Sequence, residues 1–108
     1  MDIQCHGFSS TESLREYVEH RFQFALTRFH DRIVRISVQL SDINGPRGGV
    51  DKRCLIHVEL RGLSALSVKD TETDLYVAID RASKRVERSL VRHLRRPDSV
   101  AIDQLAGW

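Results

Sequence analysis

The chain has 108 residues, with 17 Lys or Arg and 15 Asp or Glu, and a formal net charge of +2. This length predicts one domain that can bury a core without disulfides or metals. No apolar run approaches the roughly 20 residues of a transmembrane helix, and the N-terminus shows no secretory signal. Cys5 and Cys54 have no motif spacing. We therefore expect a cytoplasmic protein with reduced thiols.

The first third of the chain predicts a strand and then a helix. Residues 1–7 alternate in polarity, as a short strand does. In residues 9–30, Ser9 and Glu12 have the spacing of a capping box at a helix start. Apolar residues then recur at helical intervals and form one face. They are Leu14, Val18, Phe22, Ala25 and Phe29.

Three alternating segments follow, in residues 32–42, 50–62 and 63–70. A period of two indicates strands with one buried face. Gly62 allows a tight turn between the last two, whereas the glycine-rich segment 43–49 predicts a flexible connection. Because the links are short, we expect an antiparallel meander.

The last element begins near residue 74 and stops before Pro97, which cannot continue a helix. The element order is strand, helix, three strands, helix. We expect an α+β fold of the order β-α-β-β-β-α, with a four-stranded sheet and two helices on one face. The domain covers residues 1–96, and residues 97–108 form a short tail that ends in Trp108, the only tryptophan.

The positive charge is concentrated in one segment. Residues 80–96 carry seven Lys or Arg and two Asp or Glu, whereas residues 1–79 carry ten and eleven. On a helical wheel all seven cations lie within about 60° of one line. We call this set the basic stripe; its members are Arg81, Lys84, Arg85, Arg88, Arg92, Arg95 and Arg96.

The basic stripe favours a phosphate-binding surface over a merely solvated helix face. Like charges four residues apart destabilise a helix by a few tenths of a kcal/mol each. Arginine outnumbers lysine, which suits bidentate phosphate contacts. A straight line of cations fits backbone shape more than base edges, so structured RNA is the expected ligand. A solvated face, an acidic protein and a membrane surface remain as alternatives.

Two further groups are possible secondary RNA contacts. Arg47, Lys52 and Arg53 lie in or next to the glycine-rich connection, which is otherwise simply a hairpin loop. Arg21 and Arg28 alternate with Tyr17 and Phe24 along one flank of the first helix. That flank is either a second RNA-facing strip or packing at the edge of the core.

Neither catalysis nor cofactor binding is indicated. The five histidines and two cysteines show no metal-ligand spacing, and no nucleophile motif or carboxylate pair is present. We therefore expect no enzyme activity, no metal, no cofactor and no small-molecule substrate.

Three segments resemble the family of ribosome hibernation promoting factors and ribosome-associated inhibitors. They are "DLYVAIDRASKRVERSLVRHLRR", with Asp74, Tyr76, Ala78, Ile79, Asp80 and Leu90, then "SLREYVEHRFQFALTRFHDRI" and "HVELRG". The resemblance covers about residues 2–96 and implies an RNA-binding fold similar to double-stranded-RNA-binding domains. It also implies docking on the small ribosomal subunit and its ribosomal RNA, where the protein occludes the tRNA and mRNA sites and idles translation under stress, without a cofactor.

Two features depart from the family pattern. The segment 41–53 is long and glycine-rich, and residues 97–108 are too short for the C-terminal dimerisation module of long members. We therefore do not expect ribosome pairing through such a module, and the oligomeric state stays open. The rival hypothesis is a regulatory module whose basic helix binds an acidic protein, such as a transcription factor.

Overall fold

The computed structural model describes residues 1–7, 9–43 and 51–95. Four strands and two α-helices make up this part of the chain. In chain order they are β1 (Asp2–His6), α1 (Glu12–Leu26), β2 (Ile33–Asp42), β3 (Lys52–Leu60), β4 (Leu66–Glu72) and α2 (Leu75–Arg95), with a short 3-10 helix, η1 (Thr27–Phe29), after α1.

The four strands form one sheet in the order β1-β2-β3-β4. The expected antiparallel meander is confirmed, since β3 pairs antiparallel with both β2 and β4. β1 pairs in parallel with β2, with Ile3 opposite Val38. A parallel pair needs a crossover, and α1 provides it. Consequently β1 and β4 form the two edges of the sheet.

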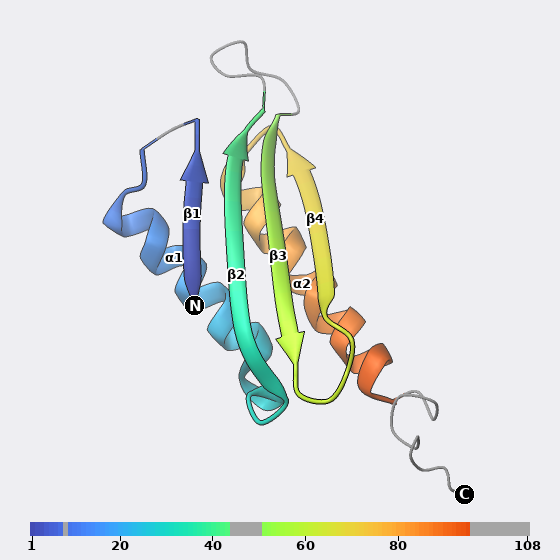
Figure 1. Ribbon diagram of the computed structural model, residues 1–108. Coiled ribbons are helices and arrows are strands. Elements are labelled where there is room, and N and C mark those ends of the chain that lie inside the picture. The colour runs from blue at the N-terminus through green and yellow to red at the C-terminus, as the bar shows by residue number, and fades with distance from the viewer. Residues whose placement is uncertain (8, 44–50, 96–108) are drawn as a thin grey trace, which may run out of the picture.

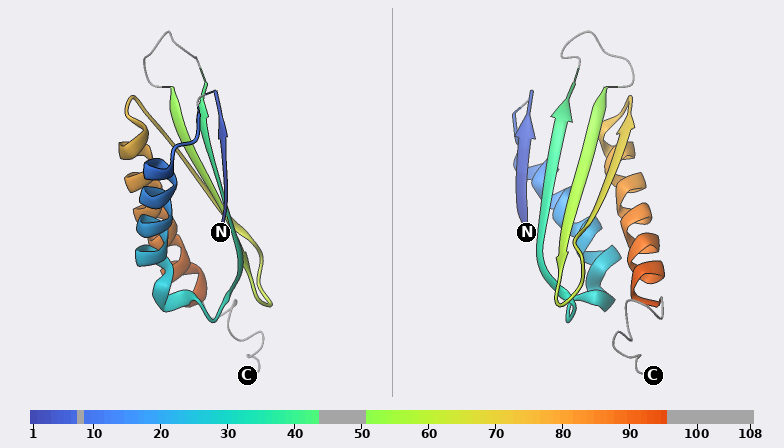
Figure 2. Two further views of the ribbon diagram at one scale, coloured as in Figure 1. Left: turned by 90° about the vertical axis from the view of Figure 1, so that its left-hand side faces the viewer. Right: turned by 45° about the vertical axis from the view of Figure 1, so that its right-hand side comes forward.

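Both helices cover the same face of the sheet, as Figure 2 shows from the side. In Figure 1, α1 lies behind β1 and β2, and α2 lies behind the β4 side. The core between the layers contains the inward residues of all four strands and the apolar faces of both helices. The expected α+β fold with two helices on one face is therefore confirmed, and the opposite face of the sheet carries no described helix.

The start of α1 differs from the sequence prediction. Thr11 is the N-cap, and its Oγ1 accepts a hydrogen bond of 3.1 Å from the amide of Leu14. Ser9 lies outside the helix, so the capping box of Ser9 with Glu12 is wrong. Three hydroxyl residues precede the helix in succession, and the sequence does not distinguish among them, because each satisfies the preference for a side-chain acceptor.

The β3–β4 connection shows why Gly62 stands in the turn. Its φ of +74° lies in the left-handed region that glycine adopts without strain. β4 begins at Leu66 rather than at residue 63, so the predicted strand was placed slightly too early. In the observed register of β3 and β4, Cys54 lies opposite Asp70.

The apolar face of α2 fixes which of its sides looks outward. Five apolar residues of α2 are fully buried, and Leu75 is half-buried at the helix start. The fully buried apolar residues are Ala78, Ile79, Ala82, Val86 and Leu90. The polar side of α2 is therefore directed away from the core.

Within the described residues no helix is long and apolar enough to cross a membrane.

Candidate nucleic-acid interface

The basic stripe follows the polar side of α2. Asp74 precedes the helix, and its Oδ1 accepts a 2.8 Å hydrogen bond from the amide of Tyr76. Five members of the stripe have exposed side chains, as the helical wheel predicted. They are Arg81, Lys84, Arg85, Arg88 and Arg92. Arg95 is the last residue of α2, with a side chain that is not described, and Arg96 lies outside the described residues.

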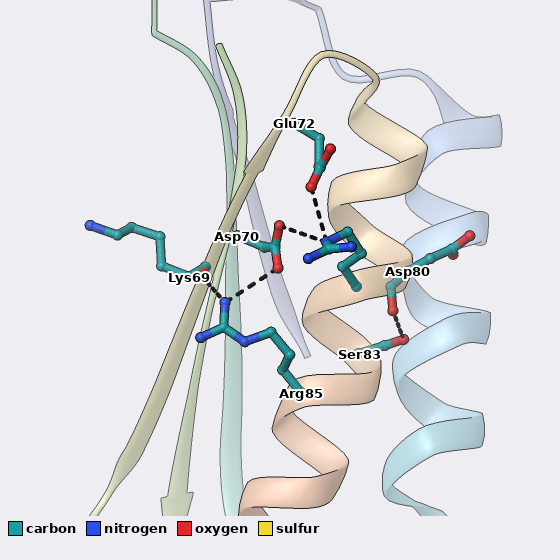
Figure 3. A network of polar contacts seen from close by, with 7 residues as sticks. Lys69, Asp70, Glu72, Asp80, Ser83 and Arg85 are labelled. Atoms are coloured by element: carbon teal, nitrogen blue, oxygen red, sulfur yellow. Dashed lines mark hydrogen bonds and ion pairs between the residues drawn. The ribbon is translucent and has the colours of Figure 1, made fainter. Parts of the chain in front are cut away.

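Two arginines of the stripe pair with carboxylates of the neighbouring strand. Arg81 Nε lies 3.3 Å from Asp70 Oδ1 and 3.0 Å from Glu72 Oε2. Arg85 Nη1 lies 3.3 Å from Asp70 Oδ2 and donates a 2.6 Å hydrogen bond to the carbonyl of Lys69. Figure 3 shows Asp70 on β4, directed at α2, with Arg85 reaching across to the strand. The charges of these two arginines are thus largely neutralised within the molecule.

The two acids of α2 turn toward α1 and pair with its arginines. Asp80 Oδ1 lies 2.9 Å from Arg21 Nε, in an ion pair without the alignment of a hydrogen bond. Glu87 Oε2 lies 3.5 Å from Arg28 Nη2. Arg21 and Arg28, predicted as possible secondary RNA contacts, therefore have internal partners. Arg28 also lies over the ring of Phe29, 4.9 Å from its centroid.

Lys84, Arg88 and Arg92 form the free part of the stripe. Among the described residues, none of these three cations has an ion pair or hydrogen bond to another side chain. Arg92 also borders a recess of about 190 Å³ that Leu66, Ser89 and His93 line. Three exposed cations at spacings of four residues present their donors to solvent on one side of α2.

The residues around the glycine-rich connection do not form one group. The ammonium of Lys52 lies 2.9 Å from Asp51 Oδ1 and 3.5 Å from Asp42 Oδ1. The hydrogen bond to Asp51 raises the pKa of Lys52 above its ordinary value, against the opposing effect of desolvation. Its charge is therefore offset locally. Arg53 is half-buried in β3, opposite Thr71, and Arg47 lies outside the described residues.

The aromatic residues of the first helix divide between two environments. Tyr17 is half-buried and contacts the ring of Tyr76 edge-on, with centroids 4.8 Å apart. The hydrogen bond to Asp80 is the main reason that the pKa of Tyr17 is raised, and burial adds to it. Phe24, in contrast, is 79% exposed. Packing at the core edge therefore accounts for Tyr17 and not for Phe24.

The sequence analysis did not identify Asp70 and Glu72 as partners of the basic stripe. For Asp70, its position in the strand pattern does indicate that it needs a partner. It occupies an inward position of β4, two residues after the buried Val68, and is itself buried. A carboxylate at such a position requires a charged or hydrogen-bonding partner, because burying it unpaired is costly. As for other chemistry, no group of three potential metal ligands occurs among the described residues.

The structure is thus an open α+β sandwich whose outer helix carries a row of cations. The chain belongs to the family described as sigma 54 modulation protein / S30EA ribosomal protein, whose model matches residues 1–97. A comparison with curated protein sequences gave no match. The expected relationship to ribosome-associated factors is confirmed at the level of the family.

Two solved structures resemble the chain. The N-terminal domain of Protein Y from Thermus thermophilus is 29% identical, with a TM-score of 0.70, over 85% of this chain and 98% of that one. A ribosomal subunit interface protein from Coxiella burnetii has a TM-score of 0.70 over 89% of this chain and 100% of that one. At 23% identity, this second likeness concerns the fold alone.

Proposed function

We propose that this protein binds the small ribosomal subunit by laying α2 along phosphates of ribosomal RNA, and that it thereby occludes the tRNA and mRNA sites. Three exposed cations, Lys84, Arg88 and Arg92, carry the proposal, since none of them has an ion pair within the described part of the chain. Arginine donors match phosphate oxygens, and the contacts release counterions from the RNA. The described part of α2 is roughly 30 Å long, so its free cations can follow several phosphates.

The family supports the ribosome as the partner. The description of the family includes a ribosomal protein. In this proposal the protein acts in the cytoplasm, idles translation under stress as a hibernation factor, and carries out no catalysis. Arg95 and Arg96 extend the contact beyond the free cations, Arg81 and Arg85 belong to the same side of the helix but are paired with Asp70 and Glu72, and Arg21, Arg28, Arg47, Lys52 and Arg53 are secondary candidates.

Co-sedimentation with purified small subunits across a salt series tests this function. We expect binding that weakens steeply as salt rises, because each phosphate contact contributes to the slope of log K against log salt. A competing tRNA should displace the protein if the two share a site. Binding that persists with tRNA present would contradict occlusion, and the absence of binding at low salt would contradict the ribosomal function itself.

The family description also names modulation of sigma 54, which favours one alternative. In that alternative the free cations meet an acidic protein partner. Capture of the partner that survives nuclease treatment would support this second function, whereas loss of capture after nuclease treatment would support RNA.

A further inference from the structure

Asp70 of β4 is a buried carboxylate shared by two arginines of the basic stripe. Its side chain is 6% exposed, whereas those of Arg81 and Arg85 are 59% and 49% exposed. Each oxygen faces a different guanidinium at 3.3 Å, and Glu72 adds a third carboxylate contact of 3.0 Å on Arg81. The labelled residues in Figure 3 show the arrangement around Asp70 and Arg85.

The position of Asp70 explains why this cluster persists. Asp70 follows the inward alternation of β4 and faces Cys54 across the strand pair. Its charge adds to burial in raising the pKa of the Cys54 thiol to about 12. A carboxylate surrounded by core atoms is stable as an anion only when cations neutralise it. Asp70 therefore retains its arginines more firmly than a surface acid would.

A carboxylate and a phosphate oxygen take the same donors from a guanidinium. Arg81 and Arg85 together carry two positive charges, and Asp70 and Glu72 carry two negative ones. Arg85 gives a further hydrogen bond to the Lys69 carbonyl, so leaving β4 would break two contacts. An arginine already paired with an internal anion attracts little additional anion and contributes little to counterion release.

We propose that Asp70 and Glu72 are internal counter-anions that withhold Arg81 and Arg85 from RNA phosphates, so that Lys84, Arg88 and Arg92 determine the strength of RNA binding. The inference rests on the proposed function, because it assigns the roles of cations within the same surface. Asp70 is a positioning residue in this account and does not itself contact RNA. Fewer cations of the basic stripe therefore bind RNA than the sequence alone suggests.

The test is a set of single and double variants bound to purified small ribosomal subunits across a salt series. Arg88→Gln should weaken binding about tenfold at moderate salt and lower the salt slope by about one. Arg85→Gln, which removes the same charge one helical turn earlier, should change the affinity less than about threefold. In an Asp70→Asn background Arg85 is released, so Arg85→Gln should then weaken binding as strongly as Arg88→Gln does.

Because Asp70→Asn alters a buried residue and could affect folding, a second variant at the more exposed Glu72 tests the same inference. Asp70→Asn removes a buried charge, and its fold is checked by circular dichroism. Glu72 is 30% exposed, so Glu72→Gln tests release of Arg81 with little effect on the core. Both substitutions should raise the affinity and the salt slope. If Arg85→Gln and Arg88→Gln weaken wild-type binding equally, or if neither acid variant strengthens it, the inference is wrong. If Arg88→Gln also has no effect, the proposed function fails with it.

Discussion

Tyr17 of α1 donates a hydrogen bond of 2.5 Å from its hydroxyl to Asp80 Oδ1 of α2, across 63 residues of sequence. Asp80 also pairs with Arg21, and its carbonyl accepts a 2.8 Å hydrogen bond from the Ser83 hydroxyl. This cluster lies on the flank of α2 that faces α1. It joins the two helices side by side and adds to the burial of the apolar face in holding the orientation of α2.

Replacing Tyr17 with Phe should destabilise the protein by about 1 kcal/mol, because a hydrogen bond to a carboxylate is lost from a partly solvated site. The matched control is Tyr76→Phe, since no hydrogen bond of the Tyr76 hydroxyl occurs among the described residues. It keeps the ring contact with Tyr17 and should change the free energy of unfolding far less. Urea denaturation of both variants measures the difference, and equal losses would contradict a specific role for the Tyr17 hydroxyl.

The same pair predicts a dependence on pH. The hydrogen bond to Asp80 and burial raise the pKa of Tyr17 in the folded state above its ordinary value of 10.0. A raised pKa favours the protonated phenol, so the stabilisation is complete below pH 10 and is lost as the pH rises through the folded-state pKa. The stability difference between wild type and Tyr17→Phe should stay constant from pH 7 to 9 and shrink above pH 10. A difference that grows above pH 10 would contradict this assignment.

The N-cap of α1 gives a third prediction with a neighbouring control. Thr11→Ala removes the acceptor for the Leu14 amide and should cost about 1 kcal/mol. Ser9→Ala alters a residue outside the helix and should change the stability by less than about 0.5 kcal/mol. Thermal unfolding of the two variants distinguishes the observed cap from the one that the sequence suggested. A larger loss for Ser9→Ala would favour the capping box.

The two thiols should differ widely in reactivity. Burial and the Asp70 charge raise the pKa of Cys54 to about 12, and its side chain is fully buried, whereas Cys5 is half-buried. The thiolate is the reactive form, so alkylation of the native protein at pH 8 should modify Cys5 first. Mass spectrometry after timed alkylation measures both sites, with a urea-denatured sample as control. Equal rates in the native protein would contradict the buried position of Cys54.

Much of this architecture could be predicted from the sequence because it depends on local periodicity. The alternation in β2 and β3 and the helical spacing of Val18 and Phe22 each encode a buried face. The outward position of the basic stripe also followed from the helical wheel. The N-cap did not follow, because Thr11 competes with two hydroxyl residues directly before it.

The electrostatics of the site could not be predicted in this way. A helical wheel relates residues of one helix, but the anions that pair with the stripe belong to β4, and the acids of α2 pair with α1. Such pairs depend on the register of β4 and on the packing of α1 against α2. A stripe that is uniform in sequence therefore divides in the structure. Arg81 and Arg85 are paired, whereas Lys84, Arg88 and Arg92 have no ion pair among the described residues.

The central claim, that the free cations of α2 bind the small subunit, is tested most directly by a charge-matched comparison. One variant replaces Lys84, Arg88 and Arg92 with Gln. The control variant replaces Arg15, Arg32 and Arg35 with Gln. These three arginines are exposed outside the stripe and have no ion pair among the described residues. In co-sedimentation with purified small subunits, the account predicts that the first variant loses binding at least 100-fold and about three units of salt slope, while the control stays near wild type. An equal loss of affinity in both variants would mean that binding depends on the net charge of the protein and not on the position of these cations, which would contradict the claim. Unchanged binding of the first variant would contradict it as well.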